Sequence, residues 1–187
     1  MLVGRGLSAS EALAGAFVTA LAYVFFFELN DWLFSRVKVT DNISWIFLPA
    51  AIRMVSVLLF GWAGVLGLFA GSLVILFNQV AIQPGHVLAL ATLSSMPSLL
   101  AARLVQRALQ IGHDLAGMTG RQLLVFGLAG GVANSLVHTL YFVGREGSLA
   151  SFHGFVPMFV GDSVGTLLML YAGAIGLRRI RQAPSAD

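Results

Sequence analysis

The chain has 187 residues, of which 58% are hydrophobic and 10% are charged, and its formal net charge is +3. Soluble domains carry roughly 25% charged residues, so this composition excludes a water-soluble globular body and predicts a protein embedded in the lipid bilayer. Cysteine is absent, which excludes disulfides and thiolate metal sites, and the basic residues are scattered or lie at the ends of apolar runs, a distribution that predicts no nucleic-acid binding.

Six apolar runs predict transmembrane helices, because a bilayer core about 30 Å thick needs ~20 apolar residues per helix. The predicted spans are residues 11–33, 43–61, 62–80, 87–104, 122–143 and 155–177. The corner between the second and third spans is so short that it predicts a tight turn. We therefore expect an all-α bundle in which residues 1–182 form a single six-helix transmembrane domain, followed by a short polar tail at 183–187.

The basic residues predict the orientation of the six spans, because cytoplasmic loops carry an excess of Lys and Arg. Six spans place seven basic residues on one side, namely Arg5, Arg103, Arg107, Arg121, Arg178, Arg179 and Arg181. Three lie on the other side, namely Arg36, Lys38 and Arg145. The asymmetry predicts a multi-pass protein of the bacterial inner membrane with both termini in the cytoplasm.

Small residues recur at a spacing of four in several predicted spans. They are Ala12, Ala16 and Ala20; Gly67 and Gly71; Gly127 and Gly131; and Gly161 and Gly165. This spacing lets helix backbones approach closely in lipid. We expect these positions to pack the helices of the bundle against one another, and the alternative is an interface with a second protein.

Ionisable and polar side chains inside the spans form the candidate site, because a charge that faces lipid costs several kcal/mol. Arg53 and Asp162 fall at matched depth in the outer half when depth is counted at ~1.5 Å per residue, which predicts a pair across the bundle. Asn134 and His138 are four residues apart, so they share one helix face at similar depth. Glu28 is shallower. Together these five residues predict a polar cavity open to the periplasm.

Each of these residues also has a structural interpretation. Arg53 and Asp162 would form an ion pair that only fixes the register of the helices, His138 would be a hydrogen-bonded interior histidine, and Glu28 would simply be hydrated near the membrane interface. No nucleophile stands beside a base, no glycine-rich phosphate loop follows a strand, and no spaced carboxylate pair suggests hydrolysis. The sequence therefore predicts that the protein is not an enzyme, and we expect no metal and no cofactor.

Two segments carry a resemblance to a known family. The first is Trp-Ile-Phe-Leu-Pro at 45–49, followed by Phe-Gly at 60–61 and a glycine-rich helix; the second is Gly-Asp-Ser-Val-Gly at 161–165. In order and spacing they resemble the membrane-associated sensor domains of bacterial signalling proteins, type one of the MASE family, over residues 43–177. The resemblance implies a membrane sensory or interaction module. Its motif residues here are Trp45, Pro49, Gly61, Gly161, Asp162 and Gly165.

Two other classes of protein fit the pattern. The substrate-binding subunits of energy-coupling-factor transporters also have about six helices, and their small-residue surface is similar to the stripe of Ala12, Ala16 and Ala20. An accessory subunit of a larger membrane complex is the third interpretation. A protein partner is expected at the cytoplasmic segment 106–121 or at the small-residue helix faces. The predicted cavity leaves room for a small-molecule ligand, which the sequence does not identify.

Overall fold

The computed structural model describes residues 7–40, 43–78, 83–110, 119–147 and 149–182. These residues form six α-helices: α1 (Ala9–Phe34), α2 (Pro49–Phe60), α3 (Trp62–Phe77), α4 (Pro84–Leu109), α5 (Gly120–Glu146) and α6 (Phe155–Gln182). The short 3-10 helices η1 (Ser35–Val37) and η2 (Leu149–Gly154) and the strands β1 (Lys38–Thr40) and β2 (Ile43–Ser44) complete the described elements. The predicted all-α class is confirmed.

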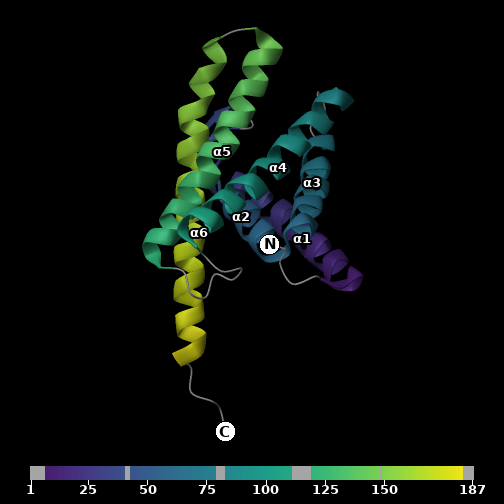
Figure 1. Cartoon of the computed structure of the whole chain (residues 1–187). Helices are drawn as coiled ribbons and strands as arrows, with labels where there is room; N and C mark the ends of the chain where they lie inside the picture. Colours follow the sequence, from purple (N-terminus) through teal and green to yellow (C-terminus); the bar gives the residue numbers. More distant parts are fainter. Residues whose placement is uncertain (1–6, 41–42, 79–82, 111–118, 148, 183–187) are drawn as a thin grey trace.

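Successive helices run up and down through the bundle, so that α1 begins and α6 ends toward the lower part of Figure 1. Helix α1 packs mainly against α3, and α5 packs between α4 and α6. Helix α2 contacts each of the other five helices, although it has only 12 residues. The shortest helix is therefore the centre of the bundle.

Local signals in the sequence explain where several helices begin and end. The side chain of Ser8 caps α1 and forms a capping box with Glu11, and Thr119 forms the same box with Gln122 at the start of α5. Gly61 joins α2 to α3 with a φ of 54°, a backbone conformation that favours glycine, so the predicted tight turn is present.

Among the described residues, four helical segments are long and apolar enough to cross a membrane: Ala9–Val37, Pro84–Leu109, Gly120–Glu146 and Phe152–Gly173. Helices α2 and α3 are shorter; at 1.5 Å per residue they measure about 18 and 24 Å, less than the ~30 Å of a bilayer core. The predicted second span is wrong in its first part, because residues 43–44 form a strand and the helix begins only at Pro49. Strand β2 pairs with β1 in an antiparallel hairpin.

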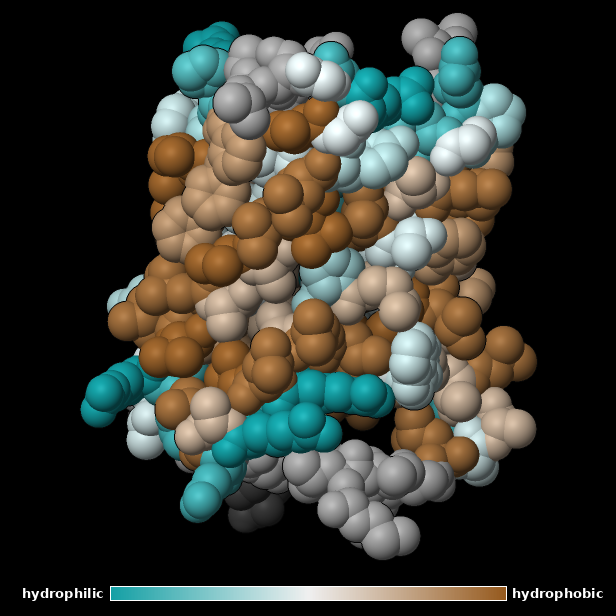
Figure 2. All heavy atoms as spheres, turned by 45° about the horizontal axis from the view of Figure 1, so that its top comes forward, coloured by the Kyte–Doolittle hydropathy of each residue, from teal (hydrophilic) through white to brown (hydrophobic). Residues whose placement is uncertain are grey.

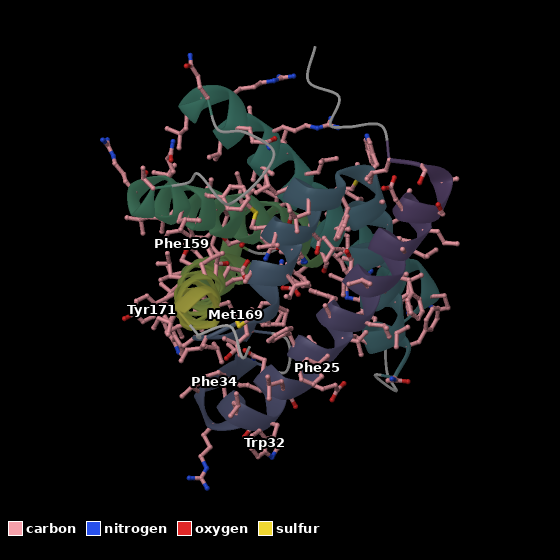
Figure 3. The ribbon with its side chains drawn as sticks, turned by 90° about the horizontal axis from the view of Figure 1, so that it is seen from below. Phe25, Trp32, Phe34, Phe159, Met169 and Tyr171 are labelled. Atoms are coloured by element: carbon pink, nitrogen blue, oxygen red, sulfur yellow. The ribbon has the colours of Figure 1, made fainter. Side chains whose placement is uncertain are left out.

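The surface has the pattern of a protein that lies in a bilayer. Figure 2 shows a broad hydrophobic band on the face turned to the viewer, between hydrophilic rims at its upper and lower edges. Helix α1 exposes many large apolar side chains, and only 17% of its most apolar stretch is buried. Figure 3 shows Trp32 of α1 and Tyr171 of α6 at the outer edge of the bundle, and 77% and 69% of these residues are exposed. Apolar side chains in such numbers face outward because lipid, not water, is their solvent.

The small residues of α3 pack against α1. An added Cβ at Gly67 would overlap the backbone oxygen of Ala16, and one at Gly71 would lie 3.1 Å from the backbone oxygen of Ala20. Packing inside the bundle is thus confirmed for this pair of helices. The stripe of Ala12, Ala16 and Ala20 is only half-buried, however, and the buried residues of α1 are Gly15, Thr19, Tyr23 and Asn30.

Helices α5 and α6 approach each other through the predicted glycines of α5. A Cβ at Gly127 would lie 3.2 Å from the methyl carbon of Thr166, and one at Gly131 would lie 2.7 Å from the hydroxyl oxygen of Ser163. Close approach here brings Asn134, one turn beyond Gly131, next to α6.

Parts of the predicted organisation lie outside the described residues. The tail at 183–187 and residues 111–118 of the expected partner segment are among them. The remainder of that segment is mostly helical, since α4 continues to Leu109 and α5 begins at Gly120. The connection between α4 and α5 is therefore shorter than the sequence predicted.

Candidate functional site

An ion pair joins the central helix to the last one. Nη2 of Arg53 in α2 donates a hydrogen bond of 3.1 Å to Oδ1 of Asp162 in α6. Arg53 is 4% exposed and Asp162 is 3% exposed. The predicted pairing of these two residues is confirmed.

Asn134 extends this pair to α5. Its Nδ2 donates to Oδ2 of Asp162 at 2.6 Å, so each carboxylate oxygen of Asp162 has a partner on a different helix. His138, one turn further along α5, has its Nδ1 3.0 Å from the backbone oxygen of Asn134. A carbonyl oxygen only accepts, so Nδ1 of His138 donates this bond and Nε2 of the neutral ring remains an acceptor. Arg53, Asp162, Asn134 and His138 form what we call the polar cluster.

The segment 45–48 enters the bundle as irregular backbone just before α2. Such backbone is tolerated at membrane depth only where protein buries it and its polar groups have partners. The N–H of Phe47 donates to the backbone oxygen of Gly161 at 3.0 Å, and the N–H of Leu48 donates to Oδ1 of Asn30 at 2.8 Å. The ring of Phe47 lies under the guanidinium of Arg53, with Cζ 5.0 Å from the ring centre.

Glycine is required where α6 meets this segment. An added Cβ at Gly161 would overlap the backbone oxygen of Ser44, and one at Gly165 would overlap that of Phe47. The two segments that carry the family resemblance therefore contact each other directly, although more than 100 residues of sequence separate them. Of their motif residues, Pro49 is buried, Trp45 is 44% exposed, and Gly61 lies apart at the corner between α2 and α3.

A cavity of about 460 Å³ lies beside the polar cluster, a volume within the range of small-molecule sites. All six helices, the hairpin and η2 contribute to its lining. Its apolar wall contains Tyr23, Phe27, Phe47, Ile75, Leu76, Leu90, Phe142 and Met158, and its polar residues include the whole polar cluster with Ser72, Ser94, Thr139, Glu146 and His153.

Buried polar atoms without a hydrogen-bond partner gather around this cavity. Among the described residues there are six such atoms, and four belong to residues of the lining: Nε of Arg53, Oδ1 of Asn134, and the hydroxyls of Ser72 and Thr139. Buried polar groups in proteins nearly always have partners, water or ligand included. Four buried hydrogen-bonding atoms are therefore available to a polar molecule in the cavity.

The structure does not bring every predicted site residue together. Glu28 is exposed on α1 and does not belong to the cavity lining, so its assignment to the polar cluster is wrong. The sequence-based assignment also missed Asn30, whose Oδ1 accepts the N–H of Leu48. Asn30 lies between Glu28 and Asp31 at the polar end of an apolar run, so no local signal distinguished it. Within the described residues, no three carboxylate or imidazole groups gather closely enough to hold a metal ion.

These features define an α-helical membrane protein with an internal cavity beside a buried polar cluster. The chain matches no family model, no curated protein and no solved structure. The site itself is therefore the evidence for function.

Proposed function

We propose that this protein is a membrane sensory or interaction module that binds a small molecule in the cavity beside the polar cluster. The observation that carries this proposal is the position of Arg53 and Asp162 in the lining of a cavity of about 460 Å³. A buried ion pair contributes little net stability, because desolvation offsets most of the attraction between the charges. A pair that only held the helices in register would also need no cavity beside it.

The membrane arrangement belongs to the same proposal. We propose six crossings of a bacterial inner membrane, in which residues 45–48 begin the second crossing and α2 continues it. The alternating directions of the helices support this, as does the excess of basic residues on the proposed cytoplasmic side. The hairpin, Glu146 and His153 would then surround a periplasmic mouth of the cavity.

The resemblance to the type-one MASE sensor domains is retained as a proposal about class. Its support is that the two motif segments contact each other, because Phe47 of the first segment contacts both Gly161 and Gly165 of the second. Both segments also contribute to the cavity, through Phe47 and Asp162. A motif that builds one wall of a ligand cavity is what a sensory module requires.

The transporter-subunit alternative is weaker, because the backbone of Ala16 and Ala20, two of the three alanines that suggested it, packs against glycines of α3. A protein partner would more readily contact the cytoplasmic connection between α4 and α5. An accessory-subunit role remains compatible with the exposed apolar faces of α1, but it gives no reason for the cavity.

Cysteine accessibility tests the proposal, and the chain supplies a cysteine-free background. Ser94→Cys places a thiol in the lining, whereas Ser95→Cys places one on the next residue of α4, which is 1% exposed and outside the lining. In intact cells, a charged, membrane-impermeant methanethiosulfonate reagent should modify Ser94→Cys at least tenfold faster than Ser95→Cys. Equal rates, or no reaction at either position, would overturn the proposal that the cavity is open to the periplasm.

A further inference from the structure

The deep part of the cavity carries no net charge. Arg53 and Asp162 cancel each other, and Asn134 is neutral. The third charged residue of the lining, Glu146, is exposed at the end of α5 and lies away from the polar cluster. A charged group placed at the polar cluster would be buried without a counter-ion of its own, because Arg53 and Asp162 already pair with each other, and this is strongly unfavourable in an apolar interior.

The partnerless atoms define what the ligand must offer. Nε–H of Arg53 is a donor without an acceptor, and Oδ1 of Asn134 is an acceptor without a donor. The hydroxyls of Ser72 and Thr139 can serve as either. One group that accepts and donates side by side, such as an amide or lactam, matches this set.

The rest of the wall suits a flat ring. Four aromatic side chains line the cavity, those of Tyr23, Phe27, Phe47 and Phe142, together with aliphatic residues of α3 and α4. Aromatic side chains favour stacked or edge-on contacts with other rings. At about 30 Å³ of liquid volume per water molecule, the cavity has the space of roughly 15 waters, enough for a two-ring compound.

We infer that the ligand class is an electrically neutral, ring-bearing molecule whose head group both donates and accepts hydrogen bonds. This inference rests on the proposed ligand-binding function and names the chemistry that the site would recognise. The ring would lie against the aromatic wall, and the head would lie at the polar cluster.

A matched set of naphthalenes tests the charge and the head group separately. The protein in lipid nanodiscs is dialysed to equilibrium against 2-naphthamide, 2-naphthoate, 2-naphthylmethylammonium and 2-methylnaphthalene, with empty nanodiscs as the control for partition into lipid. We expect saturable binding of the amide, at least tenfold tighter than that of the two ions and of the hydrocarbon. Tighter or equal binding of an ion would overturn the inferred class, and so would the absence of saturable amide binding.

A pair of isosteric variants tests the head-group contacts. Thr139→Val removes a partnerless hydroxyl of the lining, whereas Thr19→Val removes a partnerless, buried hydroxyl that is outside the lining. Amide binding should weaken three- to tenfold in the first and stay unchanged in the second, with 2-methylnaphthalene unaffected in both. Equal effects of the two variants would overturn the placement of the head group. The cysteine experiment above tests independently of these results whether the cavity is open to the periplasm.

Discussion

The N–H of Phe47 donates a hydrogen bond of 3.0 Å to the backbone oxygen of Gly161. This contact holds the irregular segment 45–48 against α6, beside the polar cluster. One turn further along α6, Gly165 lies so close to the backbone of Phe47 that no side chain fits between them. The position of the Phe47 ring under Arg53 depends on both contacts.

Gly165→Ala should therefore destabilise the protein. Its Cβ would overlap the backbone oxygen of Phe47, and backbone cannot move aside as a flexible side chain does. Overpacking of this kind typically costs about 1–3 kcal/mol, so the thermal midpoint in nanodiscs should fall clearly. Gly173→Ala is the matched control, because it lies in the same helix with nothing within 4 Å of its Cβ. A midpoint for Gly165→Ala as high as that of the control would contradict the close contact.

Asn30→Leu should also lower stability, for a different reason. Leucine has nearly the same size but no acceptor, so the buried N–H of Leu48 would lose its partner. An unsatisfied buried donor costs about 1–3 kcal/mol. Glu28→Gln is the control from the same helix, because Glu28 is exposed and should change the thermal midpoint little. Equal effects of the two substitutions would show that the bond to Leu48 does not stabilise the fold.

Reporter fusions test the proposed membrane arrangement. A reporter at the C-terminus and one within residues 144–152 should report opposite sides of the membrane, because α6 lies between them. The basic residues near the end of α6 predict that the C-terminus is cytoplasmic. The same side at both positions would contradict the crossing of α6 and the six-span arrangement with it.

The sequence predicted those parts of the molecule that depend on local composition. Apolar runs located the helices, and the short connection between the second and third runs indicated the tight turn at Gly61. The pairing of Arg53 with Asp162 was also predictable, because two opposite charges at matched depth in an apolar bundle leave few other arrangements.

The remainder depends on tertiary contacts that no local pattern encodes. The irregular segment at 45–48 is as apolar as a helix, and it avoids helical structure because Gly161, Gly165 and Asn30 give its backbone space and partners. The aromatic wall combines Tyr23 and Phe27 of α1 with Phe142 of α5 and Phe47 of the irregular segment, so no single spacing in the sequence reveals the whole wall. Glu28 was misassigned because position along a helix does not tell which way the side chain faces, and Glu28 faces outward.

The last prediction concerns the energetic coupling of Arg53 and Asp162. Removing one partner of a buried pair leaves the other charge without compensation and typically costs ~3–5 kcal/mol. Arg53→Gln and Asp162→Asn should therefore each lower the thermal midpoint sharply. The double variant should lose clearly less than the sum of the two, because neither charge is then stranded.

The third partner sharpens the design of this experiment. Nδ2 of Asn134 donates a hydrogen bond to Oδ2 of Asp162. This bond keeps its charged acceptor in Arg53→Gln. In Asp162→Asn the acceptor is uncharged, so the bond is weaker. Of the two single variants, Asp162→Asn should consequently be the less stable. Adding Asp162→Asn to Arg53→Gln should change the thermal midpoint little. Thermal unfolding of the four proteins in identical nanodiscs measures the coupling. Strict additivity would mean that the two charges do not stabilise each other, and that water in the cavity hydrates Asp162 instead.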